Sequence, residues 1–289
     1  MSGFAGLRVL ALESRRAPEL AKLISNYGGE PIVAPAMREV PLESNREALA
    51  FAAALFAGEF DMVIFLTGVG ARALLSVVET TYKREEYVAA LQRVSVVPRG
   101  PKPVAVLREL GVTPAITVPE PNTWRELLLA LDEAGASRAE LRLRGARVAV
   151  QEYGVSNPEL LSGLRERGAS VTRVPIYQWA LPEDLAPLQA AVRALAEGEI
   201  DVVLFTTGVQ VAHLFQIAAE MKLEKLMLRG VNRAIVASIG PTTSEELQRR
   251  GIRADLEPSH PKMGFLVKEA AEQSEGLFRR KRQRNGSAD

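Results

Sequence analysis

The sequence predicts an α/β protein with two doubly wound parallel sheets that arose by internal duplication. The first observation is a stretch that occurs twice: Gly58–Val69 (GEFDMVIFLTGV) returns 140 residues later as Gly198–Val209 (GEIDVVLFTTGV). Each copy reads as a short apolar run, a Thr-Gly turn and the start of a helical pattern. The second observation is that both runs are apolar on both faces, which is typical of a parallel sheet covered by helices on each side.

The same spacing recurs outside this stretch. Further matched positions are Pro18 with Pro158, Gly28 with Gly168, Pro35 with Pro175, Gly100-Pro101 with Gly240-Pro241, and Pro121 with Pro261. One register slip is needed near the start of each half, where Arg8 answers Arg147. A self-match of this extent indicates a duplicated α/β unit, and a ligand site is expected between the two copies.

Strand and helix patterns alternate through the first half of the chain. Strands are expected at 7–12, 31–34, 62–66, 94–97 and 115–118, and helices at 18–26, 45–56, from about 70, 101–110 and 123–134. Gly28 follows the first helix as a stop signal, Ser44 is the expected N-cap of the second, and Pro101 falls in the first turn of its helix.

The second half repeats this order. Strands are expected at 147–151, 171–176, 202–206 and 234–239, and helices at 158–167, 184–196, 243–250 and 265–271. Only four strand ranges are assigned in this half, but by the repeat we predict five strands alternating with helices in each half. Ligands are expected to gather at the carboxyl ends of the strands. Residues 275–289 contain a basic run at 279–284, and we expect a disordered, solvated tail there rather than a nucleic-acid arm.

Composition excludes several classes of protein. A chain of 289 residues with 47% hydrophobic residues suggests two globular domains. The formal net charge of +1 selects neither nucleic acid nor a membrane surface as a partner. The absence of cysteine excludes disulfides, thiol catalysis and thiolate metal sites. The apolar runs are too short to span a bilayer and the first residues do not read as a signal peptide, so we expect a cytoplasmic protein.

Three blocks of the sequence, taken in their order, carry a resemblance to a known family. They are Val174–Gln178 (VPIYQ), Leu204–Gln210 (LFTTGVQ) and Ser238–Leu247 (SIGPTTSEEL) with the glycine at position 251. Together with the length, the repeat and the missing cysteine, they resemble the uroporphyrinogen-III synthases, cofactor-free enzymes that close the tetrapyrrole ring. The resemblance spans nearly the whole chain.

The resemblance also implies where the domains begin and end. The duplication alone would divide the chain once, near Arg144. The family instead has two flavodoxin-like domains joined by two linker strands, here near 35–41 and 173–182. This implies a discontinuous domain 1 (1–36 and 178–274), an inserted domain 2 (37–177) and the tail at 275–289.

What the family does sets the expected chemistry. The implied substrate is hydroxymethylbilane, a linear tetrapyrrole with eight carboxylates. The implied enzyme is a cyclising hydro-lyase that removes water, inverts the last pyrrole ring and closes the macrocycle in the cleft between the two domains, without a cofactor. We also expect a monomer, and a transient contact with hydroxymethylbilane synthase.

Free backbone N–H groups at helix starts can hold such carboxylates. Four matched turns, two in each half, would supply them, and their residues are the expected substrate contacts: Thr67, Gly68, Val69, Gly70, Gly100, Lys102, Thr206, Thr207, Gly208, Gly240, Thr242 and Thr243. The alternative interpretation of each Thr-Gly pair is a capped helix start with no ligand. Four such turns in matched positions favour a carboxylate-binding site.

Other candidate residues each have a structural alternative. The resemblance makes Tyr177 the candidate general acid for the departing hydroxyl, and the alternative is a tyrosine that packs the linker. Tyr153 and Gly154 follow a strand, and His260 lies in the loop before the last helix, so all three join the expected substrate contacts. Pro103 stands where many family members have threonine, which leaves Lys102 as the charge at that turn.

No metal site is expected. His213 lies among apolar residues of its predicted helix and reads as a packed or surface histidine. His213 and His260 are far apart in the sequence, and neither has clustered carboxylates beside it, which makes a poor set of metal ligands.

Two other functions remain open at this point. One is a non-catalytic two-lobed binding or sensor protein for an anionic small molecule or a tetrapyrrole, which suits the same fold. We would expect a sensor to carry an output domain or an export signal, and the sequence shows neither. The other is a synthase-like scaffold without activity, against which the intact Tyr177 and Gly240–Thr243 argue.

Overall fold

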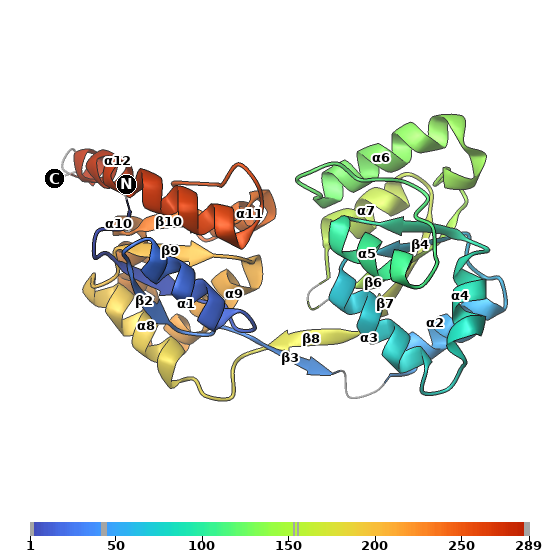
Figure 1. The fold of residues 1–289 in the computed structure, drawn as a ribbon, viewed down its shortest axis with the longest axis horizontal. Coiled ribbons are helices and arrows are strands. Elements are labelled where there is room, and N and C mark those ends of the chain that lie inside the picture. Colours follow the sequence, from blue (N-terminus) through green and yellow to red (C-terminus); the bar gives the residue numbers. More distant parts are fainter. Residues whose placement is uncertain (1–2, 42–44, 153, 155, 286–289) are drawn as a thin grey trace. The chain divides into compact units, whose positions relative to one another are not determined.

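The computed structural model of the chain describes residues 3–41, 45–152, 154 and 156–285. It divides into two compact units: unit 1 comprises Met1–Arg38 and Ala180–Asp289, and unit 2 comprises Glu39–Trp179 (Figure 1). Unit 2 is therefore inserted into the chain of unit 1. Ser44, the expected N-cap of the second helix, lies outside the described residues.

Unit 1 is built on a four-stranded parallel sheet with the order β10-β9-β1-β2. Its strands are β1 (Arg8–Ala11), β2 (Glu30–Val33), β9 (Val202–Phe205) and β10 (Ile235–Ser238). In the central strands Leu10 lies opposite both Ile32 and Val203. Strands β9 and β10 are buried along their whole length, which explains their continuous apolar runs.

Helices cover both faces of this sheet. One face carries α1 (Ala17–Asn26) and α12 (Met263–Asn285), and the other carries α8 (Ala186–Glu197), α9 (Gly208–Glu220), α10 (Glu224–Arg233) and α11 (Pro241–Arg249). Alternate side chains of β1 enter the two cores: Val9 and Ala11 pack toward α1 and α12, whereas Leu10 packs toward α8 and α9.

Unit 2 has the same plan. Its parallel sheet has the order β5-β4-β6-β7, with strands β4 (Met62–Phe65), β5 (Ser95–Pro98), β6 (Arg147–Glu152) and β7 (Ser170–Pro175). One face carries α2 (Arg46–Phe56), α3 (Gly68–Val78), α4 (Arg84–Leu91) and α5 (Pro101–Glu109). The other carries α6 (Trp124–Ser137), the short 3-10 helix η1 (Ala139–Leu141) and α7 (Pro158–Glu166).

The two sheets confirm the predicted fold class of duplicated, doubly wound parallel units. The strands of unit 2 are the repeat equivalents of those of unit 1 in the same order: β5 corresponds to β10, β4 to β9, β6 to β1 and β7 to β2. Each sheet takes two strands from the first half of the chain and two from the second, so the repeats have exchanged strands. Two further strands, β3 (Arg38–Pro41) and β8 (Tyr177–Ala180), pair with each other as a separate two-stranded sheet and are the linker strands.

The predicted fifth strand of each half is wrong. Residues 115–118 form no strand, and only the Ala115 N–H reaches the sheet, donating to the Val96 carbonyl at 2.7 Å. In unit 1 the corresponding contact is a single bridge between Ala237 and Leu256. Prolines at 114, 119 and 121 flank the stretch in unit 2, and since proline has no N–H to donate, a ladder cannot extend through them.

The predicted disordered tail is also wrong as far as residue 285, because α12 continues to Asn285. Leu277 is buried and Phe278 packs on the same core as α1. Lys281 forms an ion pair with Asp255 and donates to the carbonyl of Ala234. In the sequence, Leu277 and Phe278 are followed directly by the basic run at 279–284. The end of the helix therefore shows no amphipathic pattern.

Asp61 and Asp201 occupy matched positions of the repeat and accept hydrogen bonds at the amino ends of the central strands. Asp61 accepts hydrogen bonds from the Arg147 backbone N–H (2.8 Å) and from its guanidinium (2.7 and 3.0 Å). Asp201 accepts the Arg8 backbone N–H at 2.8 Å. These pairs tie β4 to β6 and β9 to β1, so both aspartates are structural.

The Asp61 pair predicts a pH-dependent stability. The hydrogen bonds from the Arg147 side chain, and then from its backbone, hold the pKa of the Asp61 carboxyl below its ordinary value. A carboxyl with a lowered folded pKa stabilises the fold above its unfolded pKa, and this contribution is lost as the pH falls through the folded pKa. Because the pair is exposed, we expect Asp61→Asn to lower the free energy of unfolding by about 0.5–1 kcal/mol near neutral pH. The difference should shrink below about pH 4 in urea titrations, and a pH-independent difference would contradict this account.

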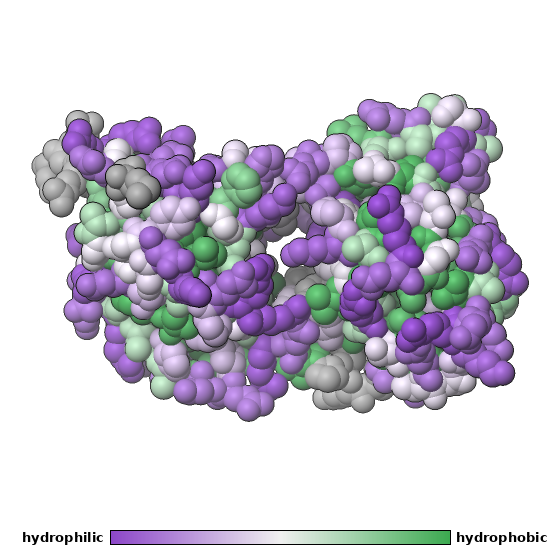
Figure 2. Space-filling model, in the orientation of Figure 1, coloured by the Kyte–Doolittle hydropathy of each residue, from purple (hydrophilic) through white to green (hydrophobic). Residues whose placement is uncertain are grey.

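Neither a long apolar helix nor a uniformly apolar face is seen in the described part of the chain. On the face drawn in Figure 2, hydrophilic and hydrophobic residues are interspersed over both units. No helix among the described residues combines the length and the apolar composition needed to cross a bilayer.

Candidate functional site

In unit 2 the turns after β4 and β5 lie against each other. Thr67 caps α3, its Oγ1 accepting the Gly70 N–H at 3.0 Å. Gly68 packs so closely on the next turn that a Cβ there would come within 2.7 Å of the Lys102 carbonyl oxygen. Gly100 is the extended N-cap of α5. The predicted contacts from these two turns are therefore brought together at one edge of the sheet, with Val69 and Lys102 exposed.

Gly154 and Tyr177 are also neighbours in unit 2. The Gly154 N–H donates to the Tyr177 carbonyl at 3.2 Å, and a Cβ at Gly154 would come within 1.9 Å of the Trp179 ring. The Tyr177 ring meets Trp179 edge-on, with 5.6 Å between ring centroids. Tyr177 is 6% exposed and its hydroxyl is buried. Its packing role is thus visible, and its role as an acid stays a prediction. Tyr153 lies outside the described residues.

Gln151 is a residue of this edge that the sequence reasoning missed. It is fully buried near the end of β6, and its Nε2 donates to the Glu152 carbonyl at 2.6 Å. Its Oε1 has no hydrogen-bond partner among the described residues. A Cβ on Gly70 would come within 2.1 Å of the Gln151 amide. Gly70 is therefore needed to make room for this buried amide at the start of α3.

In unit 1 the turn after β9 is tied up by internal hydrogen bonds. Thr207 caps α9, accepting the Val209 N–H at 3.4 Å. The Thr206 N–H donates to Gln210 Oε1 and its hydroxyl donates to Glu13 Oε2, both at 2.8 Å. Gln210 Nε2 donates back to Thr206 Oγ1 at 2.8 Å. Thr206 therefore holds the turn in shape, with Glu13 and Gln210 as partners that sequence reasoning missed.

The buried side-chain amides of Gln151 and Gln210 occupy equivalent places in the two units but come from different elements. Gln210 is the repeat equivalent of Gly70, and both lie in the first turn of their helix. In unit 1 the helix supplies the amide, and in unit 2 the glycine leaves room for Gln151 from the neighbouring strand. The sequence signal that could have revealed this difference is that Gly70 and Gln210 stand at matched positions of the repeat.

The second turn of unit 1 follows β10. Gly240 caps α11 and lies near Pro261, to which a Cβ on the glycine would come within 3.7 Å. The Thr243 side chain is buried and Thr242 is exposed. His260, next to Pro261, is exposed and meets Phe265 edge-on with 4.8 Å between ring centroids. Gly208, at the turn after β9, sits against the Glu246 side chain of α11, so these two turns adjoin as in unit 2.

His213 has a structural role. Its Nδ1 lies 2.8 Å from the Ala36 carbonyl oxygen, which joins α9 to the segment that leads into β3. Over the described residues, no three histidine, aspartate or glutamate side chains come together in an arrangement that could hold a metal ion.

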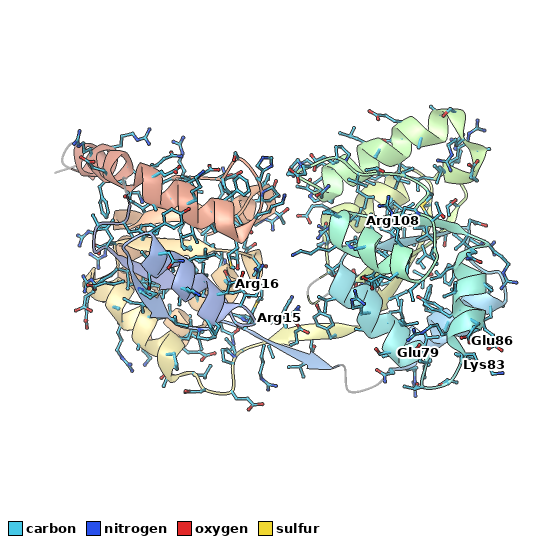
Figure 3. All side chains as sticks on the ribbon, viewed as in Figure 1. Arg15, Arg16, Glu79, Lys83, Glu86 and Arg108 are labelled. Atoms are coloured by element: carbon cyan, nitrogen blue, oxygen red, sulfur yellow. The ribbon has the colours of Figure 1, made fainter. Side chains whose placement is uncertain are left out.

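Charged side chains also follow the strands. Arg15 and Arg16 lie at the start of α1, just after β1 (Figure 3). Burial lowers the pKa of the Arg15 guanidinium, and the nearby Glu13 carboxylate acts in the opposite direction. Arg99 follows β5 directly, and burial lowers the pKa of its guanidinium with no opposing charge. Positive charge therefore stands at the carboxyl ends of strands in both units, where an anion would be attracted.

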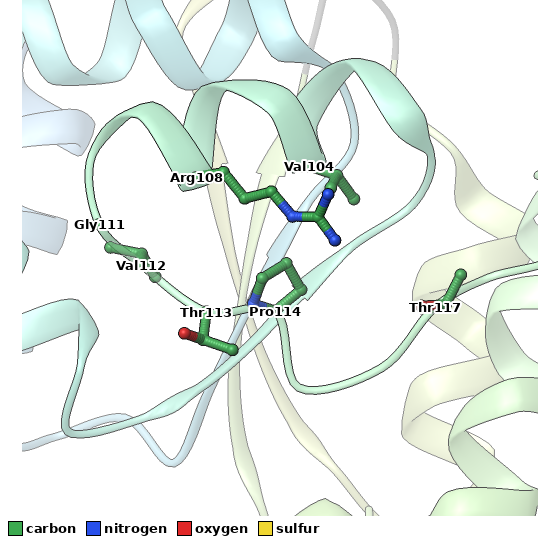
Figure 4. A pocket seen from close by; sticks show the side chains of 7 residues that line it. All are labelled: Val104, Arg108, Gly111, Val112, Thr113, Pro114 and Thr117. Carbon is green, nitrogen blue, oxygen red and sulfur yellow. The ribbon is translucent and has the colours of Figure 1, made fainter.

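Two surface hollows lie away from these turns. One, of about 270 Å³, runs along α5 and the segment after it, with the Arg108 side chain over it (Figure 4). The other, of about 620 Å³, lies between α6 and α7. Neither is lined by any of the predicted contact residues. The geometry that the turns share is a set of helix starts at the carboxyl ends of parallel strands, which suits carboxylate binding.

Comparison with known proteins shows which family the chain resembles. The family described as "Uroporphyrinogen-III synthase HemD" matches residues 18–268. The chain is 32% identical over 271 residues to the uncharacterized protein YjjA of Bacillus subtilis, covering 93% of this chain and 96% of that protein. It is 32% identical over 244 residues to a Methanothermobacter thermautotrophicus protein provisionally named uroporphyrinogen-III synthase, covering 83% and 87%.

A solved structure shares the fold. It is a mutant uroporphyrinogen III synthase from the extremely thermophilic bacterium Thermus thermophilus, with a TM-score of 0.71 and 24% sequence identity, covering 96% of this chain and all (100%) of that one.

Proposed function

The chain belongs to the uroporphyrinogen-III synthase HemD family, and from that premise we propose that it cyclises hydroxymethylbilane to uroporphyrinogen III. The observation that carries the proposal is the set of four helix starts at matched positions, after β4, β5, β9 and β10. Backbone N–H groups at such positions bind carboxylates, and the substrate carries eight of them. Each unit contributes two of these helix starts.

The reaction needs few chemical groups from the protein. The substrate hydroxyl accepts a proton and leaves as water, which generates a cationic azafulvene. The last pyrrole ring is inverted through a spiro intermediate, the macrocycle closes, and a proton is released. Because dehydration of this substrate is easy, the protein's main task is to hold the chain so that inverted closure outpaces simple closure. Exclusion of water protects the cation from capture.

The residues of the proposal are those that the turns bring together. Thr67–Gly70 with Gly100 and Lys102 serve in unit 2, together with Gly154, and Thr206–Gly208 with Gly240, Thr242, Thr243 and His260 serve in unit 1. The hydrogen bonds in the structure indicate that some of these residues shape the turns and others contact the ligand. Thr67 and Thr207 shape their turns by capping the helices. The exposed Lys102, Thr242 and His260 are then the side chains that reach the ligand.

The proposal also covers the oligomeric state, the location, the cofactor requirement and the partner enzyme. The enzyme works as a monomer in the cytoplasm and without a cofactor, and it takes hydroxymethylbilane through a transient contact with hydroxymethylbilane synthase. Handing over the substrate would limit its spontaneous closure in water.

A coupled assay tests the proposed function. Hydroxymethylbilane is generated in place, the purified protein is added, and the oxidised products are separated by chromatography. Predominantly type III isomer supports the proposal. Reactions with heat-denatured protein serve as the control and should give the type I isomer, which forms without catalysis. Only type I isomer with the folded protein would overturn the proposal and favour a non-catalytic protein that binds an anionic small molecule or a tetrapyrrole.

Tyr177→Phe tests the proton donor. If the phenol protonates the departing hydroxyl, we expect turnover to fall about ten-fold with an unchanged circular dichroism spectrum. This is less than the usual effect of a general acid, since the dehydration is easy. Tyr87→Phe is the matched control because Tyr87 is also a buried tyrosine of unit 2, and its hydroxyl has no partner in the described part of the chain. Equal turnover for Tyr177→Phe and the unmodified protein would remove Tyr177 from the mechanism.

A further inference from the structure

Arg99 stands at the turn between β5 and α5. Its N–H donates to the Phe65 carbonyl at 2.9 Å, which extends the pairing of β5 with β4 by one residue. The next residue, Gly100, is the N-cap of α5. Val97 packs on the α6 and α7 side of the sheet. Because side chains alternate along a strand, Arg99 lies on that same side, at the carboxyl edge.

The charge of Arg99 has no counterpart among the residues that the structure describes. The side chain is partly buried, and loss of water lowers the pKa of its guanidinium with no carboxylate opposing the effect. Across the residues that the structure describes, the guanidinium makes no hydrogen bond, ion pair or ring contact. Several other arginines of unit 2 are paired, such as Arg72 with Glu109 and Arg173 with Glu152. A partly buried guanidinium without a partner is costly unless a ligand supplies one.

The neighbouring helix start is poor in backbone donors. Pro101 and Pro103 have no N–H, so Lys102 is the only one of the first three residues of α5 that can donate. In α11 the repeat equivalents are Pro241, Thr242 and Thr243. Pro241 has no N–H and the Thr243 N–H donates to the Gly240 carbonyl at 3.1 Å, which leaves the Thr242 N–H. Each of the two turns thus offers an anion one N–H from the first three helix residues, so any further donor comes from elsewhere.

The repeat shows that the charge is not needed for folding this turn. The equivalent of Arg99 in unit 1 is Ile239, whose N–H makes the same type of bond, donating to the Phe205 carbonyl at 2.9 Å. Ile239 packs against the apolar core of unit 1. An apolar side chain therefore satisfies the same backbone geometry, and the guanidinium of Arg99 is available for another purpose.

We propose that the Arg99 guanidinium binds a carboxylate of the substrate, supplying in unit 2 the donors that the two prolines remove from α5. This inference rests on the proposed function and assigns to it a specific anchor. Arginine suits the role because its planar fork matches both oxygens of a carboxylate. The anchor acts on substrate binding, and the bond-breaking steps do not involve it.

Fluorescence titrations with uroporphyrin III, the oxidised product with eight carboxylates, measure this role. We expect Arg99→Ile, which installs the repeat residue, to raise the Kd about ten-fold or more, the effect of losing one charged hydrogen-bonding partner. The KM for hydroxymethylbilane should rise similarly with kcat nearly constant, as for a contact kept throughout the reaction. Arg99→Lys should show a smaller loss. Arg93→Ile, at an exposed arginine of the same unit, should change the Kd by less than about two-fold.

The outcomes separate this inference from the proposed function. Type III isomer from the unmodified protein, together with an unchanged Kd for folded Arg99→Ile, would overturn the role of Arg99 alone. Equal weakening by Arg99→Ile and Arg93→Ile would also overturn it, since that would reflect net charge. Type I isomer alone from the unmodified protein would overturn the proposed function and this inference with it. If Arg99→Ile does not fold, Arg99→Gln gives the same test, because it removes the charge and keeps a polar side chain.

Discussion

Lys281→Met is expected to lower the free energy of unfolding by about 3–5 kcal/mol, because it breaks a buried ion pair from one side. Lys281 Nζ lies 2.6 Å from Asp255 Oδ2, and the two side chains are only 11% and 9% exposed. Lys281 also donates to the carbonyl oxygens of Asn232 and Ala234. The substitution leaves the carboxylate and both carbonyls without this donor in a site that water scarcely reaches. Urea titrations followed by circular dichroism measure the loss.

Lys268→Met is the matched control for this prediction. Lys268 lies in the same helix, but its pair with Glu272 is 3.9 Å long and about half exposed, at 52% and 45%. We expect the control to change the free energy of unfolding by less than about 0.5 kcal/mol. Equal, small effects of the two variants would show that residues near 281 contribute little to the fold, as a solvated tail would.

Gly230→Ala is expected to cost about 3 kcal/mol or more through overpacking. Helix α10 crosses α8 at this glycine, and an added Cβ would come within 1.7 Å of the Leu195 carbonyl oxygen. A backbone atom cannot rotate away, so one helix must shift. The repeat equivalent in α4 is Ala90, which indicates that the two helix pairs differ in how closely they approach.

The control for this substitution is Gly276→Ala in α12. No atom lies within 4 Å of a Cβ added at Gly276, so the helix propensity of alanine should dominate. We expect a gain of about 0.5–1 kcal/mol in the free energy of unfolding. Opposite signs for the two variants in the same urea titration would support the close crossing. A loss below about 1 kcal/mol for Gly230→Ala would show that α8 and α10 separate easily.

The repeat determined much of the fold from the sequence alone. Runs such as Met62–Phe65 and Val202–Phe205 are apolar on both faces, and each precedes a Thr-Gly helix start. This local pattern has one stable outcome, a strand buried in a parallel sheet and followed by a covering helix. The four helix starts of the candidate site belong to the same local chemistry, which is why Thr67, Gly100, Thr207 and Gly240 stand where the sequence predicts.

Errors arose where one segment depends on distant partners. Residues 115–118 read as a strand by composition, but the prolines around them allow only one hydrogen bond to β5. Residues after 275 read as a solvated tail because of their charge. Leu277 and Lys281 become structural only when α1, β10 and Asp255 lie beside them.

The sequence by itself determined that this protein consists of two like α/β units with helix starts at the carboxyl ends of their strands. That information is local: periodicity, turn residues and the repeat distance all act within a few residues or between identical stretches. Only the tertiary structure decided how Gln151 fills the space above Gly70, how Gln210 and Glu13 hold Thr206, and that Arg99 has no counter-charge among the described residues. Each of these depends on contacts between residues far apart in the chain, and burial sets their energies only after the sheets have assembled.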